Sequence, residues 1–273
     1  MQNRYLSIFF LIVLLPILAF SQIKVDQYHF MIDSSKVKMK EYKYPSVNYS
    51  LNSFSVSQSG FILLSVNGGV FMPQLNIWML PPDSIPIISF STVPKDSSSF
   101  FIIMKKHYNE IIQIIKNGKP EEEIKILKMP KGIYSIYAME RNFFYLFGID
   151  TSGFNVWSYD GNLHLLFKSK KTISSFLAIK KGVWMMGFDN KIILYQNEEN
   201  PKTILHTIKK TEGLALATDG TIFYSNTDGV FQYNGKQSNK IIDGLHGFIA
   251  THNHHLFILN QNKNSVLDIT LLN

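Results

Sequence analysis

The feature that most constrains this chain is an internal repeat of short apolar segments. The clearest unit covers residues 213–233: an apolar strand that reaches Ala217, an Asp219-Gly220 turn, a second strand, a polar loop, and a third strand. Asp-Gly between apolar runs is a strong hairpin signal, because both turn residues adopt positive φ. Asn234-Gly235 then leads toward a fourth strand. The unit therefore predicts four antiparallel strands of one small sheet.

The same order of segments recurs along the chain. Clear copies occupy 136–167, 176–195 and 248–272, and weaker ones occupy 54–68 and 87–118. At the end of the first strand in five of the six units stands a small residue: Ser57, Ala138, Ala178, Ala217 and Ala250. The four alanines are 33 to 40 residues apart. We interpret them as innermost-strand positions, where neighbouring sheets converge on a central axis and leave no room for larger side chains.

Six units near the period of about 40 residues predict an all-β, six-bladed β-propeller of four-stranded antiparallel blades. The last unit contains only three strands. Residues 23–32 are strand-like and belong to no unit, so we expect this N-terminal strand to complete the last blade and close the ring. A closed ring leaves no unpaired sheet ends. A β-sandwich, an open multi-sheet protein, and a ring of five or seven blades are the alternatives.

The order of strand, Asp-Gly turn, strand, polar loop and strand ending at Tyr233 resembles the six-bladed propellers of the NHL and gluconolactonase-like superfamily. It is also similar to sensor propellers of bacterial envelope proteins. The resemblance implies a fold and not an activity, because propellers host many functions. It further implies that loops joining second and third strands open on the ligand face. In this chain those loops carry Asp150, Asp189, Asn226, Asp228, Asn260 and Asn262.

These six residues form the predicted ligand-binding set. Carboxylate and amide oxygens suit a hard cation such as Ca²⁺, and gluconolactonase-like enzymes use a comparable set around a metal. Those enzymes also need a Glu from early in the chain, for which we find no counterpart. Asp and Asn are ordinary loop formers as well. We therefore predict no metal and no cofactor.

A histidine cluster offers a second metal hypothesis. Its four members, within ten residues, are His246, His252, His254 and His255. Imidazole nitrogens bind metals, but adjacent strand residues such as His254 and His255 point to opposite faces of a sheet. We do not predict a metal site here.

The amino terminus has the pattern of a signal peptide. Arg4 precedes an apolar run over residues 6–20, and the small residues Ala19 and Ser21 precede Gln22. We predict cleavage before Gln22, a signal peptide over 1–21, and a single propeller domain over 22–273. An uncleaved anchor is the alternative, although the run is shorter than the roughly 20 residues that span a bilayer. The expected location is periplasmic or secreted, and no transmembrane segment is expected after the signal is removed.

Charge and cysteine content exclude several kinds of site and partner. The chain has no cysteine, which excludes disulfides, thiol catalysis and a lipid-anchored cysteine. Its net charge of +7 comes almost wholly from lysine, with Arg141 the sole arginine after the leader. Because phosphate recognition usually depends on clustered arginine, no nucleic-acid partner is expected.

No sequence motif of a catalytic site is present: there is no nucleophile elbow, no His-Glu-x-x-His and no phosphate-binding loop. We therefore favour an exported, non-enzymatic binding or scaffold module that engages a protein or glycan of the cell envelope through its polar loops. The alternative is a metal-dependent envelope hydrolase, lactonase or lyase with its site at the channel mouth. The sequence does not determine the oligomeric state.

Overall fold

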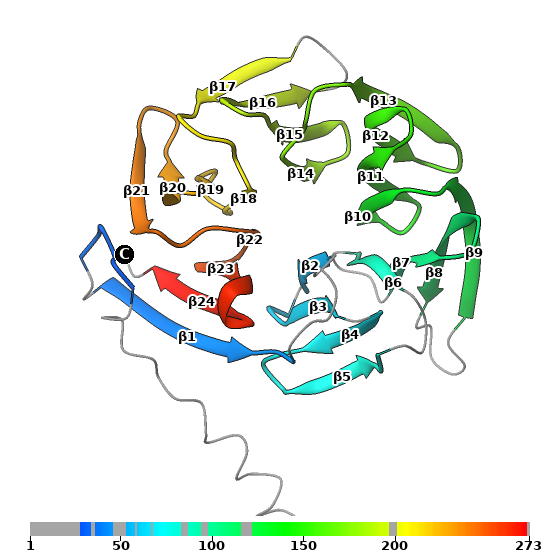
Figure 1. The fold of residues 1–273 in the computed structure, drawn as a ribbon, viewed down its shortest axis with the longest axis horizontal. Coiled ribbons are helices and arrows are strands. Elements are labelled where there is room, and N and C mark those ends of the chain that lie inside the picture. The colour runs from blue at the N-terminus through cyan, green and yellow to red at the C-terminus, as the bar shows by residue number, and fades with distance from the viewer. Residues whose placement is uncertain are drawn as a thin grey trace, which may run out of the picture.

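A computed structural model describes residues 28–33, 36–45, 53–57, 59–66, 68–82, 87–93, 98–115, 122–196 and 201–271. These residues form six four-stranded antiparallel sheets arranged as blades around a central axis (Figure 1). The predicted six-bladed β-propeller is confirmed. Among the described residues, no helix is long and apolar enough to cross a membrane.

Each of the first five blades is built from consecutive strands, with the first strand innermost. Blade 1 contains β2 (Ser53–Val56), β3 (Ile62–Val66), β4 (Gly69–Met72) and β5 (Ile77–Leu80). Blade 2 contains β6 (Ile87–Thr92), β7 (Ser98–Met104), β8 (Tyr108–Ile115) and β9 (Glu122–Pro130). Blade 3 contains β10 (Ile133–Glu140), β11 (Phe143–Asp150), β12 (Gly153–Tyr159) and β13 (Leu163–Ser169).

The second half of the ring follows the same plan. Blade 4 contains β14 (Ser175–Lys180), β15 (Val183–Gly187), β16 (Lys191–Gln196) and β17 (Lys202–His206). Blade 5 contains β18 (Gly213–Leu216), β19 (Ile222–Asn226), β20 (Gly229–Tyr233) and β21 (Ser238–Asp243). Blade 6 contains β22 (Ile249–His252), β23 (His255–Asn260), the short 3₁₀ turn η4 (Gln261–Lys263) and β24 (Ser265–Leu271).

The fourth strand of blade 6 comes from the amino-terminal part of the chain. It is β1 (Val37–Lys43), which pairs antiparallel with β24 in continuous register from Val37 opposite Leu271 to Lys43 opposite Ser265. Closure by an N-terminal strand is therefore confirmed, but the predicted segment, residues 23–32, was wrong. β1 alternates buried Val37 and Met39 with exposed lysines. That alternation suits an outer strand with one solvated face. Because the exposed positions are charged, β1 as a whole is hydrophilic.

Part of the segment predicted to close the ring lies along blade 5 instead. Phe30 forms an isolated antiparallel bridge with Ile242 of β21, and the Met31 N–H donates to the Ile241 carbonyl at 3.0 Å. Residues 23–27 fall outside the described residues. Residues 28–33 thus form an N-terminal latch against the seam between blades 5 and 6.

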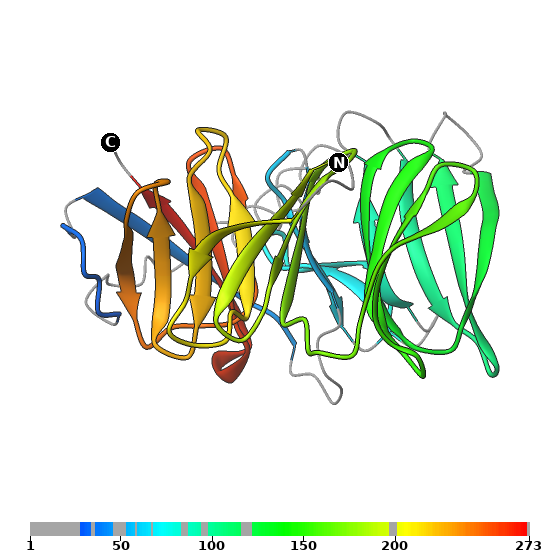
Figure 2. The same cartoon turned by 90° about the horizontal axis from the view of Figure 1, so that it is seen from above.

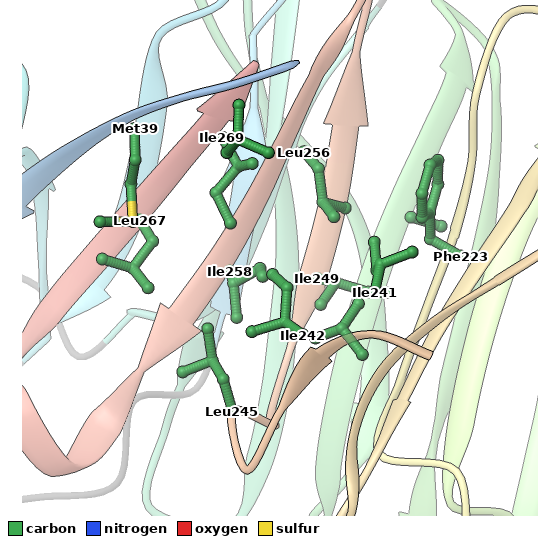
Figure 3. Packing of buried hydrophobic residues seen from close by; sticks show 13 residues of the cluster. Met39, Phe223, Ile241, Ile242, Leu245, Ile249, Leu256, Ile258, Leu267 and Ile269 are labelled. Atoms are coloured by element: carbon green, nitrogen blue, oxygen red, sulfur yellow. The ribbon is translucent and has the colours of Figure 1, made fainter. Parts of the chain in front are cut away.

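The core lies between the blades. At the seam between blades 5 and 6, Val37 and Met39 of β1 belong to the same buried cluster as Ile242, Ile258 and Ile269 (Figure 3). Each fully buried aliphatic side chain of this kind contributes about 1.5–3 kcal/mol. The seam therefore depends on packing rather than on any covalent link.

The crowding expected from the recurring alanines holds at Ala138, whereas Ala178 and Ala250 are partly exposed and line the central cavity. Ala138 lies in β10, is 2% exposed, and donates its N–H to Ser91 Oγ of blade 2 at 2.9 Å. Thr251 Oγ1 of β22 donates to the Leu216 carbonyl of β18 at 2.7 Å. Ala178 and Ala250 also lie in innermost strands, and Ala217 directly follows one. Small side chains here let neighbouring blades bond to each other.

The strand order defines the two faces of the ring. Connections from each blade to the next, and turns joining second and third strands, lie on one face, which we call the loop face. Turns joining first to second and third to fourth strands lie on the opposite face, the turn face. In the side view, η4 projects from the lower edge, which marks the loop face (Figure 2).

Candidate functional site

A pocket of about 630 Å³ opens on the loop face where blades 5 and 6 meet the N-terminal latch. Its walls come from the blade connections, the η4 turn and the latch. The lining residues are Tyr28, His29, Ser174, Lys210, Glu212, Asp243–Phe248 and Leu259–Lys263.

The pocket adjoins the central channel. A second cavity, of about 430 Å³, is lined by the innermost strands of all the blades. Ser174, Glu212 and Phe248 line both cavities. These three residues belong to connections that lead into innermost strands, so the pocket lies at the channel mouth.

Backbone packing brings Glu212 and His246 together at the channel mouth. Glu212 directly precedes β18, and its N–H donates to the Ser225 carbonyl at 2.8 Å. A Cβ atom on Gly213 would lie 2.5 Å from the Gly247 carbonyl oxygen. The absence of a side chain at Gly213 therefore lets the connection that carries His246 pass close over the start of β18.

Glu212 and His246 form a hydrogen-bonded pair. The Glu212 Oε2 to His246 Nδ1 distance is 2.6 Å, and both side chains are partly exposed. The bond uses one ring nitrogen and fixes the imidazole orientation. Nε2 has no protein partner among the described residues, so it is available to a ligand as donor or acceptor according to the tautomer.

The remaining walls of the pocket add a cation, an amide and aromatic rings. Lys210 is exposed, and Phe248 is 48% exposed. The Lys263 ammonium lies 4.8 Å from the centre of the Tyr28 ring, and Asn260 Nδ2 lies 3.5 Å from the Tyr28 hydroxyl. Aromatic surface beside several hydrogen-bonding groups is the usual make-up of a small-ligand site.

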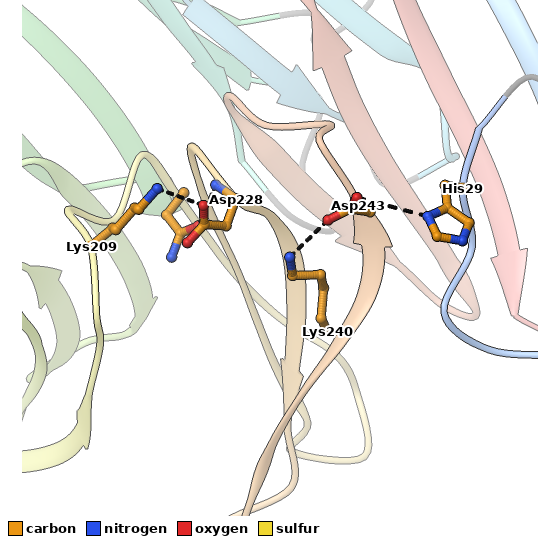
Figure 4. A network of polar contacts seen from close by, with 6 residues as sticks. His29, Lys209, Asp228, Lys240 and Asp243 are labelled. Atoms are coloured by element: carbon orange, nitrogen blue, oxygen red, sulfur yellow. Dashed lines mark hydrogen bonds and ion pairs between the residues drawn. The ribbon is translucent and has the colours of Figure 1, made fainter.

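Ion pairs fix the surrounding loops (Figure 4). Lys209 Nζ lies 2.5 Å from Asp228 Oδ1, and Asp243 accepts from Lys240 Nζ at 2.7 Å. His29 Nδ1 lies 3.7 Å from Asp243 Oδ2. The Lys240 hydrogen bond, more than any other contact, lowers the pKa of Asp243 below its ordinary value. The His29–Asp243 contact ties the latch to blade 5, and the Lys209–Asp228 pair ties the connection before β18 to the turn after β19.

The six predicted ligand-binding residues all lie on the loop face, but they do not converge. Only Asn260 and Asn262 line the pocket. The Asn226 side-chain oxygen Oδ1 accepts from the Asp228 N–H at 2.8 Å, and Asp150 Oδ1 accepts from the Ser152 N–H at 2.7 Å. Asp189 is exposed in the turn between β15 and β16. Asp150 and Asn226 therefore serve their own turns, and their role in ligand binding stays a prediction.

The pKa of Asp150 shows the balance at such a turn. Burial acts to raise it, but hydrogen bonds from Ser152 oppose that effect, and the net result is a pKa below the ordinary value. The carboxylate is therefore ionised and already engaged by its own loop.

The described residues contain no group of three or more His, Asp, Glu or Cys side chains placed to hold a metal. The histidine cluster is split between the faces. His246 lies at the channel mouth, and His254 lines a small cavity on the turn face. His255 Nδ1 lies 2.6 Å from Asp268 Oδ1.

Glu212 and Lys210 were not among the residues predicted from sequence. They lie in no motif, and their importance comes from position: they stand just before an innermost strand, where the connections of neighbouring blades converge. Ser174 holds the corresponding place before β14. Attention to residues just before each innermost strand would have found them.

This chain is similar to known proteins in fold. No protein-family model and no curated protein sequence matches this chain. A gluconolactonase from Xanthomonas campestris matches with a TM-score of 0.62 and 8% identity, covering 89% of this chain and 94% of that one. A chain of the nidogen/laminin complex matches with a TM-score of 0.61 and 13% identity, covering 77% and 89%.

A third match is the virginiamycin B lyase of Staphylococcus aureus, in a catalytically inactive form with quinupristin. Its TM-score is 0.56 and its identity 11%, covering 86% of this chain and 100% of that one. The shared property is the propeller. At these identities the matches, which include enzymes and a protein–protein complex, establish the fold alone.

Proposed function

We propose that this chain is an exported, non-enzymatic binding module that holds a ligand of the cell envelope at the channel mouth. The pocket next to the channel carries the proposal, because it combines a fixed imidazole, a carboxylate, a lysine, an amide and a half-exposed aromatic ring. Among the partners expected from sequence, a protein or a glycan, this mixture favours a glycan. Sugar hydroxyls accept hydrogen bonds from the lysine and the amide N–H, donate them to the carboxylate, and do either with the imidazole, while sugar rings stack on aromatic faces.

The test is binding to a panel of envelope oligosaccharides, measured by calorimetry. Glu212→Gln keeps the shape of the side chain and removes its charge. We expect it to weaken binding of any oligosaccharide held at the mouth by about ten-fold, since hydrogen bonds to charged groups contribute about 1.5–3 kcal/mol. Asp219→Asn, on the turn face, is the matched control and should leave binding unchanged. Equal effects of both substitutions would refute this placement.

A protein ligand is the other partner expected from sequence. A pull-down from the native envelope with the wild-type chain and with Glu212→Gln separates the two. Loss of a single protein, with no oligosaccharide bound in the panel, would replace the glycan with that protein and keep the site.

The metal-dependent hydrolase, lactonase or lyase expected as the alternative needs convergent ligands for its ion. The described residues bring no such group together, so we derive no catalytic step. If a metal is bound elsewhere, adding Ca²⁺ or Zn²⁺ will raise the melting temperature, because a ligand of the native state stabilises it. We expect no shift with either ion.

Export is a separate element of the proposal and has its own test. The apolar run over 6–20 with small residues before Gln22 supports removal of residues 1–21. Mass spectrometry of the protein recovered from its producing cells should find a chain that begins at Gln22. A chain that retains Met1 in the membrane fraction would replace the cleaved leader with an anchor.

A further inference from the structure

The two faces of the propeller carry different charge. In the described connections of the loop face there are eight lysines and three carboxylates. The lysines are Lys105, Lys106, Lys131, Lys170, Lys171, Lys209, Lys210 and Lys263, and the acids are Asp189, Glu212 and Asp228. In the described turns of the turn face, three basic residues face two acidic ones: Arg141, Lys181 and Lys236 against Asp160 and Asp219. In these described segments the excess of positive charge is therefore on the loop face, and the strand-end carboxylates Asp150 and Asp243 on the same face reduce it without cancelling it.

Most of this charge is available to a partner. All eight lysines are exposed. Lys209 pairs with Asp228, and Lys105 Nζ lies 3.6 Å from Glu110. The other six make no ion pair with a described residue. They come from several blades, so the charge is spread over a broad face and not gathered in one pocket.

Large apolar side chains are exposed in or directly beside the same connections. Ile208 is 94% exposed and directly precedes Lys209 and Lys210, and Ile133 is 69% exposed, two residues after Lys131. Met104, also exposed, directly precedes Lys105. The Lys131 ammonium donates to the Lys106 carbonyl at 3.3 Å, which brings together the connection after Met104 and the connection before Ile133.

From this arrangement we infer that the loop face docks on an anionic phospholipid bilayer. Apolar side chains enter the interfacial region of a bilayer, and nearby lysines are attracted to anionic headgroups. A bilayer accepts scattered point charges and isolated apolar groups without matching pockets. The only arginine after the leader, Arg141, lies on the turn face, so the described loop-face connections lack the residue best suited to bidentate recognition. A soluble polyanion offers no apolar environment, so the exposed Ile208 side chain would gain no free energy from burial on binding it.

This inference goes beyond the proposed function and does not depend on it. Docking in this orientation turns the channel-mouth pocket toward the bilayer. A ligand that is part of the envelope would then meet the pocket without a search through bulk solution.

The experiment is flotation with vesicles of phosphatidylcholine alone and of phosphatidylcholine with about one quarter phosphatidylglycerol. We expect wild-type protein to float only with the anionic vesicles, and to be released by high salt because surface charges are screened. The double variant Lys106→Gln/Lys210→Gln should weaken binding by ten-fold or more, at about five-fold for each lysine. Ile208→Ser should weaken it by about ten-fold.

Matched controls lie elsewhere on the ring. Lys202→Gln/Lys236→Gln removes two exposed lysines at the turn-face end, and Leu165→Ser removes an exposed apolar side chain on the outer rim. Both should float like the wild type. All variants share one amino terminus, so any contribution from residues 1–27 is common to them. Circular dichroism and melting temperature confirm that each variant is folded.

Three results would overturn the inference. The first is no flotation of the wild type with anionic vesicles. The second is an equal loss in the loop-face variants and their controls. The third is tight binding to heparin together with vesicle binding that Ile208→Ser does not weaken. That result would mean that the loop face binds a soluble polyanion. A failure of vesicle binding with intact oligosaccharide binding would leave the proposed function in place.

Discussion

Gly213 controls the shape of the channel mouth at the scale of one residue. A Cβ atom there would lie 2.5 Å from the Gly247 carbonyl oxygen and 2.9 Å from the Ile249 nitrogen. Gly213→Ala must therefore push away the connection that carries His246. We expect a loss of about 1–3 kcal/mol in the free energy of unfolding, as for other overpacked sites, together with weaker ligand binding. Chemical denaturation and calorimetry measure the two effects.

Gly161→Ala is the matched control for that substitution. Gly161 has a φ of 110° and open space around its Cβ position, on the turn face. Its replacement strains the backbone without moving the pocket. Stability should fall while ligand binding stays at the wild-type value. If Gly213→Ala also leaves binding unchanged, the close approach of the two connections does not shape the site.

At the residue scale, the sequence predicted positions better than roles. Asp150, Asn226 and Asp228 lie in the expected loops because Asp and Asn favour tight turns. In these turns the side-chain oxygens of Asp150 and Asn226 accept hydrogen bonds from backbone N–H groups, so they are already engaged. Glu212 and His246 belong to connections of successive blades, and their pairing depends on how the blades pack, which no local pattern reports.

At the scale of elements, β1 determines whether the ring is closed. Lys38 lies directly opposite Thr270 in the β1–β24 pair. The chain has no native cysteine, so the double variant Lys38→Cys/Thr270→Cys should form one intrachain disulfide under mild oxidation. Directly opposed strand residues lie within the Cα separation that a disulfide spans. Non-reducing electrophoresis and mass spectrometry detect the link.

An out-of-register pair provides the comparison. Lys40→Cys/Thr270→Cys joins positions two residues apart in the register, which are about 7–8 Å apart and poorly placed for bridging. It should stay reduced. Equal cross-linking of both pairs, or of neither, would contradict the register and with it the closure by β1.

Asp243, the β21 carboxylate that His29 of the N-terminal latch approaches, predicts a pH effect. The pKa of Asp243 lies below its ordinary value of 3.8, chiefly because Lys240 donates a hydrogen bond to it. A group with a lowered pKa in the folded state adds stability above its unfolded pKa, and that stability is lost as the pH falls through the folded value. Asp243→Asn should therefore lower the melting temperature at about pH 6, and the difference should be smaller at about pH 2.5.

Asp189→Asn is the control for the latch, because Asp189 is exposed and forms no ion pair with a described residue. Its melting temperature should match the wild type at both pH values. A difference for Asp243→Asn that persists unchanged in acid would mean that its carboxylate charge contributes nothing.

The closing strand shows why element-scale prediction from sequence was incomplete. Residues 23–32 attract attention through their apolar content, but β1 alternates Val37 and Met39 with lysines. An outermost strand needs one buried face only, so period-two alternation identifies it better than total hydrophobicity. The strands of blade 5 were predictable because the Asp219-Gly220 and Asn234-Gly235 turns mark their ends.

At the scale of the whole molecule, the ring follows from a repeat in which no single blade can bury its own faces. The seams carry the core, and the recurring small residues mark the axis. The same repeat places all inter-blade connections on one face. Pocket, lysines and projecting apolar side chains therefore accumulate on the loop face without any shared sequence motif, which explains why the sequence predicted the ring and not its ligand.

The central claim is that the loop face is the surface that contacts the ligand and the bilayer. Lysine acylation of the protein bound to its native envelope fraction tests this claim most directly. We expect the loop-face lysines Lys106, Lys210 and Lys263 to lose reactivity relative to the free protein. Lys202 and Lys236, at the turn-face end, should react as before. Protection of Lys202 and Lys236 with full reactivity of Lys106, Lys210 and Lys263 would contradict the account.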